Sequence, residues 1–138
     1  MIEIGDGIYC ETGWEGANVG ALKTGEGAVL IDSPMLPRDA LRWREQVSEV
    51  ISGPPVLLIN TDYHFDHVMT DSLLCERVVA HALVEPAFSA QDGEVYVQMA
   101  QGFFPEIDEV SKQEISRLRP GYPIITFSEN LVLNLAPD

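Results

Sequence analysis

The sequence predicts an α/β fold in which helices flank a mixed β-sheet. Residues 28–31 (Ala-Val-Leu-Ile) and 56–59 (Val-Leu-Leu-Ile) are continuously apolar, which is typical of strands buried on both faces of a sheet. Between them, apolar residues recur at spacings of three and four, the period of one face of an α-helix. A strand, a helix and a strand in this order indicate that at least part of the sheet is parallel.

The N-terminal third predicts short strands joined by tight turns. Apolar segments at 2–4 and 8–10 are separated by Gly5-Asp6-Gly7, which is a turn sequence. Residues 18–24 and 27–32 flank a short Gly-containing connection, as the two strands of a hairpin do.

The helix predicted after this hairpin has one apolar face. That face consists of Leu36, Ala40, Trp43, Val47 and Val50. The helix is expected to end before residues 52–55, where a glycine and two prolines stop it. We predict that Trp43 and Val47 belong to the core.

The rest of the chain predicts further helices and strands. A short helix is expected over residues 69–77, and partly irregular helical structure over 85–119, with interruptions at Gly93 and Pro105. The remaining strands are predicted at 78–81, 124–127 and 131–135, the last two forming a hairpin. The 138 residues predict a single domain.

The charge balance restricts the partners of this chain. It contains 22 acidic and 8 basic residues, a formal net charge of −14. A nucleic-acid-binding protein needs a basic surface to neutralise phosphates, and the sequence contains none. The same charge repels anionic membrane surfaces. We therefore expect neither nucleic acid nor a membrane among its partners.

The two cysteines, Cys10 and Cys75, are too few and too far apart for a disulfide framework. Cys75 lies in an apolar stretch and is predicted to be a small buried residue. The N-terminus lacks the basic and apolar regions of a signal peptide. No apolar run approaches the roughly 20 residues that span a bilayer. These features predict a cytoplasmic protein.

Residue types that can bind metals are concentrated in the segment 62–67. Asp62, His64, Asp66 and His67 lie within six residues of a chain that has only 3 histidines. Imidazole nitrogen and carboxylate oxygen are ligands of Zn²⁺. A loop leaving a strand and then turning into a helix can direct these side chains at two neighbouring points, which suits a two-metal site. The alternative is a solvated loop whose histidines cap the next helix.

The segment 61–67 (Thr-Asp-Tyr-His-Phe-Asp-His) resembles the H-x-H-x-D-H motif of the metallo-β-lactamase-fold hydrolases. Residues 28–34 resemble that family's strand ending in Asp, and 18–21, 56–61 and 78–81 resemble other strands of its N-terminal half. The resemblance covers roughly residues 2–82. It implies a four-layered αββα sandwich built from two similar halves, of which this chain is the N-terminal half.

The resemblance also implies a function and residue roles. The chain would be a metal-dependent hydrolase that uses metal-activated water to cleave an ester, lactone, thioester, amide or phosphodiester bond of a small-molecule substrate. His64 would bind a first metal ion, and Asp66 and His67 a second. Asp66 would also act catalytically by orienting the attacking water. Asp32 and Thr61 would fix the orientation of a ligand by hydrogen bonding, although Asp32 also fits a simple turn at the end of its strand.

The sequence departs from the family pattern in three places. Asp62 stands where the motif has its first histidine; as a metal ligand, a carboxylate would shift the preference from zinc toward Mn, Fe or Mg, or weaken that site. Thr70-Asp71 replaces the usual Gly-containing turn. No histidine follows His81, so the distal metal ligands are absent. We therefore expect a domain truncated at its C-terminal end, which self-associates or requires a complementing C-terminal half.

Three functions follow from these observations. The first is the metal-dependent hydrolase. The second is a non-catalytic metal-binding or interaction module, which fits Asp62 and the missing distal ligands. The third is a redox enzyme with one non-haem iron, because a set of histidine and carboxylate ligands with open positions suits Fe²⁺.

Overall fold

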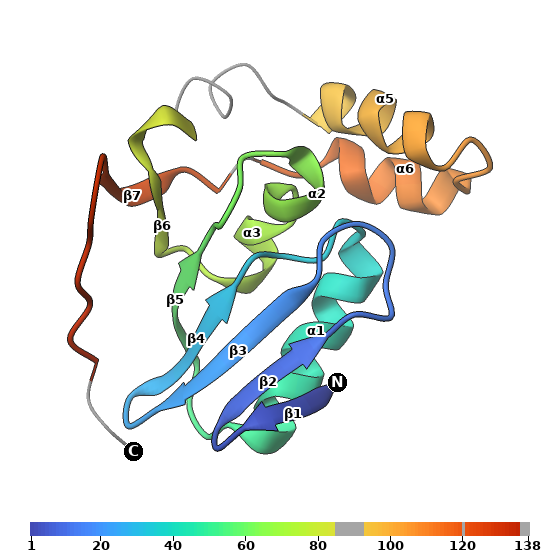
Figure 1. The fold of residues 1–138 in the computed structure, drawn as a ribbon. Helices are drawn as coiled ribbons and strands as arrows, with labels where there is room; N and C mark the ends of the chain where they lie inside the picture. Colours follow the sequence, from blue (N-terminus) through green and yellow to red (C-terminus); the bar gives the residue numbers. More distant parts are fainter. Residues whose placement is uncertain (85–92, 120, 136–138) are drawn as a thin grey trace.

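The computed structural model describes residues 1–84, 93–119 and 121–135 (Figure 1). The strands are β1 (Ile2–Gly5), β2 (Ile8–Glu11), β3 (Val19–Thr24), β4 (Gly27–Ile31), β5 (Pro55–Ile59), β6 (Val78–His81) and β7 (Pro123–Phe127). The helices are α1 (Pro37–Val50), α2 (Phe65–Val68), α3 (Asp71–Leu74), the 3₁₀ turn η1 (Ala82–Val84), α5 (Gly93–Phe103) and α6 (Glu109–Ser116). Within these described residues, no helix is long and apolar enough to cross a membrane.

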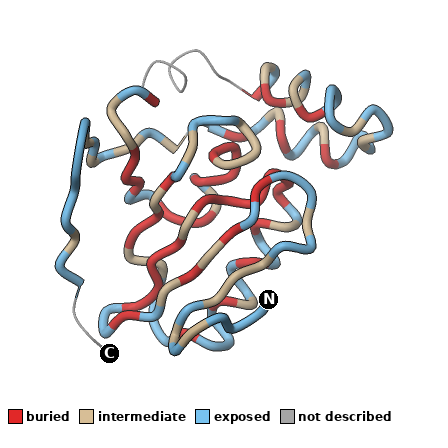
Figure 2. The backbone as a smooth tube through the Cα atoms, in the orientation of Figure 1, coloured by how far each residue is buried: buried red, intermediate tan, exposed pale blue. Residues whose placement is uncertain are grey.

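The strands form one mixed sheet, as predicted. Their spatial order is their chain order, β1 to β7. The pairs from β1 to β4 are antiparallel, and the pairs β4–β5, β5–β6 and β6–β7 are parallel. The central strands are the most buried part of the backbone (Figure 2). Because β4, β5 and β6 run in the same direction, the loops that leave them lie at one edge of the sheet.

One face of the sheet packs against α1. Trp43 and Val47 of this helix are buried against Leu30 and Leu58 of the sheet, which confirms their prediction as core residues. Trp43 also meets Trp14 edge to face, with ring centroids 6.0 Å apart. Val50, predicted on the same helix face, is instead 38% exposed because it lies in the last turn, at the edge of the contact.

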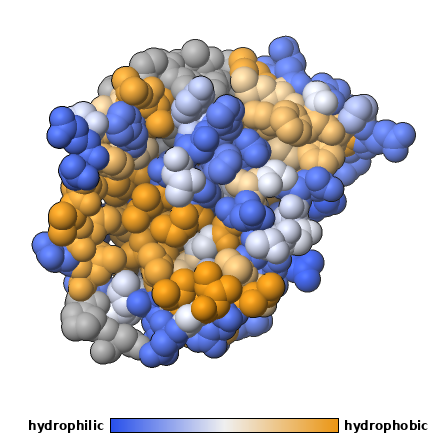
Figure 3. Space-filling view, viewed as in Figure 1, coloured by the Kyte–Doolittle hydropathy of each residue, from blue (hydrophilic) through white to orange (hydrophobic). Residues whose placement is uncertain are grey.

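The opposite face of the sheet is apolar but only partly covered. Its buried residues are Val29, Leu57 and Val79, and the partly buried residues around them are Leu22, Ile31, Val56, Ile59, Ile125, Phe127 and Leu133. Successive strand residues point to opposite faces, so this set alternates with the residues that face α1. Apolar side chains gather over this face, which is turned toward the viewer in Figure 3. We call it the open sheet face.

The predicted C-terminal hairpin was wrong. Residues 123–127 form β7, but β7 pairs in parallel with β6, and residues 131–135 form no strand. The edge of β6 offers β7 a full set of main-chain partners from a distant part of the sequence, and local turn patterns do not reveal such a partner. The short strand at 78–81, in contrast, is confirmed.

The helical predictions are confirmed in part. Of the helix expected at 69–77, the structure contains only the single turn α3. Another single turn, α2, precedes this range, and between the two the buried Thr70 hydroxyl donates a hydrogen bond to the Pro34 carbonyl. Pro105 separates α5 from α6 as predicted. Gly93, however, begins α5: a Cβ at this position would lie 2.0 Å from the Ser116 carbonyl oxygen, so the close approach of α6 requires glycine. Residues 85–92 of the predicted helical region lie outside the described residues.

Candidate metal-binding site

The predicted site residues follow two adjacent parallel strands. Asp32 comes directly after β4, and Thr61 and the segment 62–67 follow β5. This edge of the sheet, at the carboxyl ends of the strands, is where ligands bind in open α/β sheets. The topology therefore brings together residues that are about 30 positions apart in the sequence.

Asp32 connects the two loops. Its side chain is buried, and its main chain has a φ of 56°, in the left-handed region that Asp tolerates better than most residues. The carboxylate accepts hydrogen bonds from the main-chain N–H of Thr61 at 2.8 Å and from the Thr61 hydroxyl at 2.6 Å. Nδ1 of His67 lies 3.0 Å from Oδ2 of the same carboxylate. Asp32 thus contacts both Thr61 and His67.

The backbone of His67 is held as firmly as its ring. Its carbonyl oxygen accepts hydrogen bonds from the main-chain N–H of Ser33 at 2.9 Å and from the Ser33 hydroxyl at 3.0 Å. The side-chain amide of Asn60 lies 3.5 Å from the same oxygen. Our sequence reasoning missed Ser33 and Asn60. Their positions, one residue after Asp32 and one residue after β5, were the available signal.

His67 and Asp66 form one donor pair. A carboxylate only accepts hydrogen bonds, so the contact with Asp32 places a proton on Nδ1 of His67 and leaves Nε2 as the free nitrogen of the neutral ring. Nε2 lies 3.9 Å from Oδ2 of Asp66. Both side chains are 21–25% exposed, so they are accessible from solvent.

Asp62 and His64 form a second pair. The carboxylate of Asp62 accepts hydrogen bonds from the main-chain N–H of His64 at 2.6 Å and from its ring Nδ1. Burial acts to raise the pKa of Asp62, but the hydrogen bonds from His64 outweigh it and hold this pKa below its usual value. Tyr63 stacks on the His64 ring with centroids 4.7 Å apart. His64 precedes α2 but makes no side-chain capping hydrogen bond, which argues against the helix-cap alternative.

These two pairs do not make a complete metal site. Within residues 1–84, 93–119 and 121–135, no three His, Cys, Asp or Glu side chains are grouped closely enough to hold a metal ion. His81 lies elsewhere: Nε2 is 3.0 Å from the Ser128 carbonyl oxygen, and Nδ1 accepts a hydrogen bond from Leu83. Zinc sites use three or four protein ligands. The described side chains therefore do not by themselves fit a bound metal ion. They provide only part of a ligand set.

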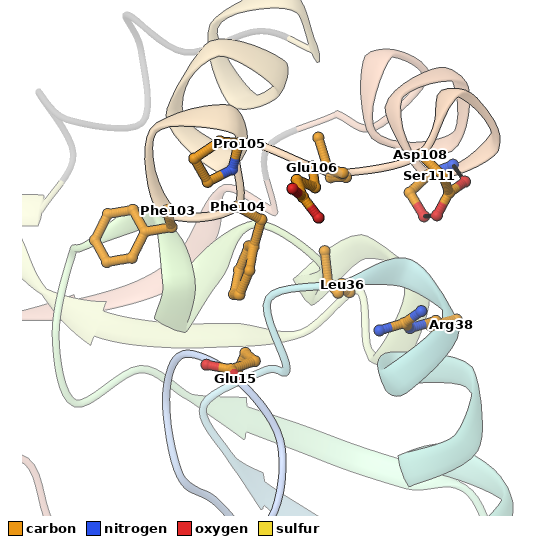
Figure 4. Close-up of a pocket in the computed structure, with 10 residues that line it drawn as sticks. Glu15, Leu36, Arg38, Phe103, Phe104, Pro105, Glu106, Asp108 and Ser111 are labelled. Carbon is orange, nitrogen blue, oxygen red and sulfur yellow. Dashed lines mark hydrogen bonds between the residues drawn. The ribbon is translucent and has the colours of Figure 1, made fainter.

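A pocket of about 430 Å³ lies next to this loop (Figure 4). It is lined by Glu15, Leu36, Arg38, Phe103, Phe104, Pro105, Glu106, Ile107, Asp108 and Ser111. None of these is a predicted site residue, so the pocket and the donor pairs are separate features. The segment that carries the donor pairs contacts the pocket lining through Phe65, whose ring lies edge-on to that of Phe103 with the ring centroids 5.1 Å apart.

Comparison with known families assigns the chain to one of them. The model of the metallo-beta-lactamase superfamily matches residues 12–133, a range that contains all the predicted site residues. The chain belongs to the metallo-beta-lactamase superfamily. Membership confirms the resemblance identified in the sequence and the α/β fold expected from it. Comparison with curated proteins gives no significant match.

Solved structures of metallo-beta-lactamases share this fold. BJP-1, a subclass B3 enzyme of Bradyrhizobium japonicum, matches with a TM-score of 0.63 and 20% identity over 98% of this chain and 47% of that one. A beta-lactamase domain protein from Burkholderia ambifaria matches with a TM-score of 0.61 and 15% identity over 98% of this chain and 44% of that one. A B3 enzyme described as having an active-site glutamic acid is 26% identical, with a TM-score of 0.52. The match covers 62% of this chain and 34% of that one. This chain spans less than half the length of each of these proteins.

Proposed function

We propose that this chain forms the N-terminal half of a metal-dependent hydrolase site. In this proposal Asp62, His64, Asp66 and His67 face the metal, and Asp66 is the catalytic residue. The observation that carries the proposal is the contact of His67 with the buried Asp32, because it fixes the ring and leaves Nε2 free for a metal. A solvated loop would not need a buried carboxylate behind its histidine.

The chemistry would be that of metal-activated water. Members of this superfamily bind divalent metals, commonly zinc. Such ions lower the pKa of bound water toward about 7 and polarise the bond under attack. The substrate class in this proposal is a small molecule with an ester, lactone, thioester, amide or phosphodiester bond. With −14 net charge, the chain favours neutral or cationic substrates over polyanions.

Asp62 bears on the choice of metal. A carboxylate in place of an imidazole makes a harder and more negative ligand set, which moves the preference from zinc toward Mn or Fe. The B3 enzyme with an active-site glutamic acid is a precedent for a carboxylate in such a site. We propose zinc as the resident metal because members of the superfamily commonly bind it, with Mn or Fe as the alternatives that Asp62 favours.

The ligands still missing would come from a complementing C-terminal half. Two observations support this partner. The matched structures contain about as much chain again outside the match. The open sheet face also carries the apolar side chains that a second layer of structure would cover. The proposed compartment is the cytoplasm, supported by the two free cysteines, Cys10 and Cys75.

Metal content per chain tests the proposal. Protein purified without chelators would be measured by elemental mass spectrometry after incubation with Zn²⁺, Mn²⁺ or Fe²⁺. The comparison is with a His64→Ala, His67→Ala double variant and with His81→Ala, whose histidine lies outside the site. Because Asp62, His64, Asp66 and His67 provide only part of a ligand set, we expect weak metal binding by the parent and by His81→Ala, and still weaker binding by the double variant. A double variant that binds each metal as well as the parent does would contradict the proposal that these residues face a metal.

The second candidate is a non-catalytic metal-binding or interaction module. It is favoured by the absence of any three-donor group among the described residues. Metal bound without turnover of ester, lactone and phosphodiester substrates, even with a C-terminal half added, would support it. A non-haem iron redox enzyme is the third candidate, and selective retention of iron in the same experiment would favour it.

A further inference from the structure

A buried polar cluster lies directly behind the metal-binding loop. Asp71 is the first residue of α3, and its side chain is completely buried. Oδ1 of Asp71 lies 3.4 Å from the side-chain nitrogen of Asn60, which is also buried. That same nitrogen is 3.5 Å from the carbonyl oxygen of His67. Asn60 therefore links the Asp71 carboxyl group to the backbone of a predicted metal ligand.

The surroundings of Asp71 favour its uncharged form. Burial raises its pKa well above the usual value, and the nearby charge of Asp32 acts in the same direction. The neighbouring polar side chains of Ser33 and Asn60 lower this pKa only in part. The other carboxyl oxygen, Oδ2, has no hydrogen-bond partner among the described residues. An ionised carboxylate with an unpartnered buried oxygen would be costly, whereas the neutral acid tolerates this position.

Two other segments close over Asp71. Gly121, just before β7, lies so close that a Cβ on it would be 2.6 Å from the Cβ of Asp71. Tyr96 of α5 is also fully buried, and first burial and then the nearby Asp71 raise its pKa. The carboxyl group is thus enclosed by α3, α5, the end of β5 and the segment before β7. A surface turn would not need such an enclosure.

We infer that Asp71 is a positioning residue, which acts through Asn60 to hold the His67 carbonyl and thereby the orientation of the His67 ring relative to Asp66. This role rests on the proposed function for its purpose, since His67 is a metal ligand only in that proposal. Ser33 holds the same carbonyl from the other side, through its N–H and its hydroxyl.

Amide hydrogen exchange and NMR of the His67 ring test this role without any metal. Asp71→Asn keeps a neutral hydrogen-bonding group of the same shape, and Asp71→Leu keeps the shape but removes the hydrogen bond to Asn60. Val47→Ala is the matched control, because it weakens the core on α1 away from the site. In Asp71→Leu we expect the Ser33 amide, which donates to the His67 carbonyl, to exchange at least about tenfold faster than in Val47→Ala. The His67 ring should also lose its single tautomer.

The conservative variant is the decisive comparison. Asp71→Asn should retain both the slow exchange of Ser33 and the Nδ1–H tautomer of His67. If Asp71→Leu matches Val47→Ala in both readouts, or if Asp71→Asn loses them as fully as Asp71→Leu does, Asp71 does not position His67. Should Asp71→Leu fail to fold, Asn60→Ala breaks the same link from its other end and must show the same loss.

Metal titration then separates this inference from the proposed function. With Zn²⁺ as the probe, we expect the affinity of Asp71→Leu to fall about 10–100-fold, as for other groups that orient a ligand, and Asp71→Asn to bind like the parent. A parent that binds no Zn²⁺ would contradict the proposed function, while the exchange data would still decide whether Asp71 holds His67. A parent that binds Zn²⁺ with equal affinity in all variants would overturn the positioning role alone.

Discussion

Nδ1 of His67 lies 3.0 Å from Oδ2 of Asp32, although the two residues are 35 positions apart in the sequence. The contact exists because β4 and β5 are parallel neighbours, so the loops that follow them meet at one edge of the sheet. Asp32 also binds the main chain and hydroxyl of Thr61. One buried carboxylate therefore contacts both the loop and the histidine that we propose as a metal ligand.

Replacing Asp32 with Asn should weaken the site while preserving the fold. Asn tolerates the left-handed main chain of this position, but its amide provides one acceptor oxygen where the carboxylate provides two. We expect a loss of about 1–3 kcal/mol in the free energy of unfolding and a fall of about 10–100-fold in Zn²⁺ affinity. Urea denaturation and calorimetric titration measure these. Asp6→Asn, in an exposed turn, is the control, and equal values for both variants would refute the role of Asp32.

The stability of the protein should depend on pH through Asp71. Its pKa is raised in the folded state and close to 4 in the unfolded chain, so the folded protein holds the proton more tightly. This contribution is fully present below about pH 4 and is lost as the pH rises toward the folded-state pKa, at up to about 1.4 kcal/mol per pH unit. Urea denaturation from pH 4 to 7 should therefore show the parent losing stability relative to Asp71→Asn. A constant difference across this range would mean that Asp71 is ionised in the fold.

Gly121→Ala should destabilise the protein by about 1–3 kcal/mol, because the new methyl group would overlap the Cβ of Asp71. Gly102→Ala is a matched control within α5, where a Cβ meets nothing within 4 Å. That substitution should instead stabilise the protein by about 0.5–1 kcal/mol, since alanine favours a helix. Thermal unfolding of both variants checks the prediction. A neutral Gly121→Ala variant would show that the segment before β7 does not close over Asp71.

The isolated chain should self-associate through its open sheet face. In solution without a C-terminal half, a second copy of the chain is the partner available to cover the partly exposed apolar residues around Val29 and Leu57. Sedimentation velocity at micromolar concentration should show dimers or larger species. Ile125→Lys on this face should shift the protein toward monomer, whereas Leu41→Lys on the exposed side of α1 should not. A parent that is a stable monomer would contradict the prediction.

Local patterns predicted the elements whose partners are close in sequence. The apolar runs at 28–31 and 56–59, and the helix between them, appear as β4, β5 and α1, because burial on both faces and helical amphipathicity leave direct traces in residue order. The helix expected at 69–77 was less accurate. Only the turn α3 forms in this range, and Thr70, the residue before it, hydrogen-bonds to Pro34, which lies 36 residues away.

The sequence by itself determined the α/β class, the family and the six residues proposed for the site, since these depend on periodicity and on a compact motif. Only the tertiary structure decided that β7 pairs with β6, that Asp32 contacts both Thr61 and His67, and that Ser33, Asn60 and Asp71 lie behind His67. The physical reason is the same in each case. A strand pairs with whichever edge is open, and a buried polar group finds its partner across the sheet, so neither choice is recorded in the neighbouring residues.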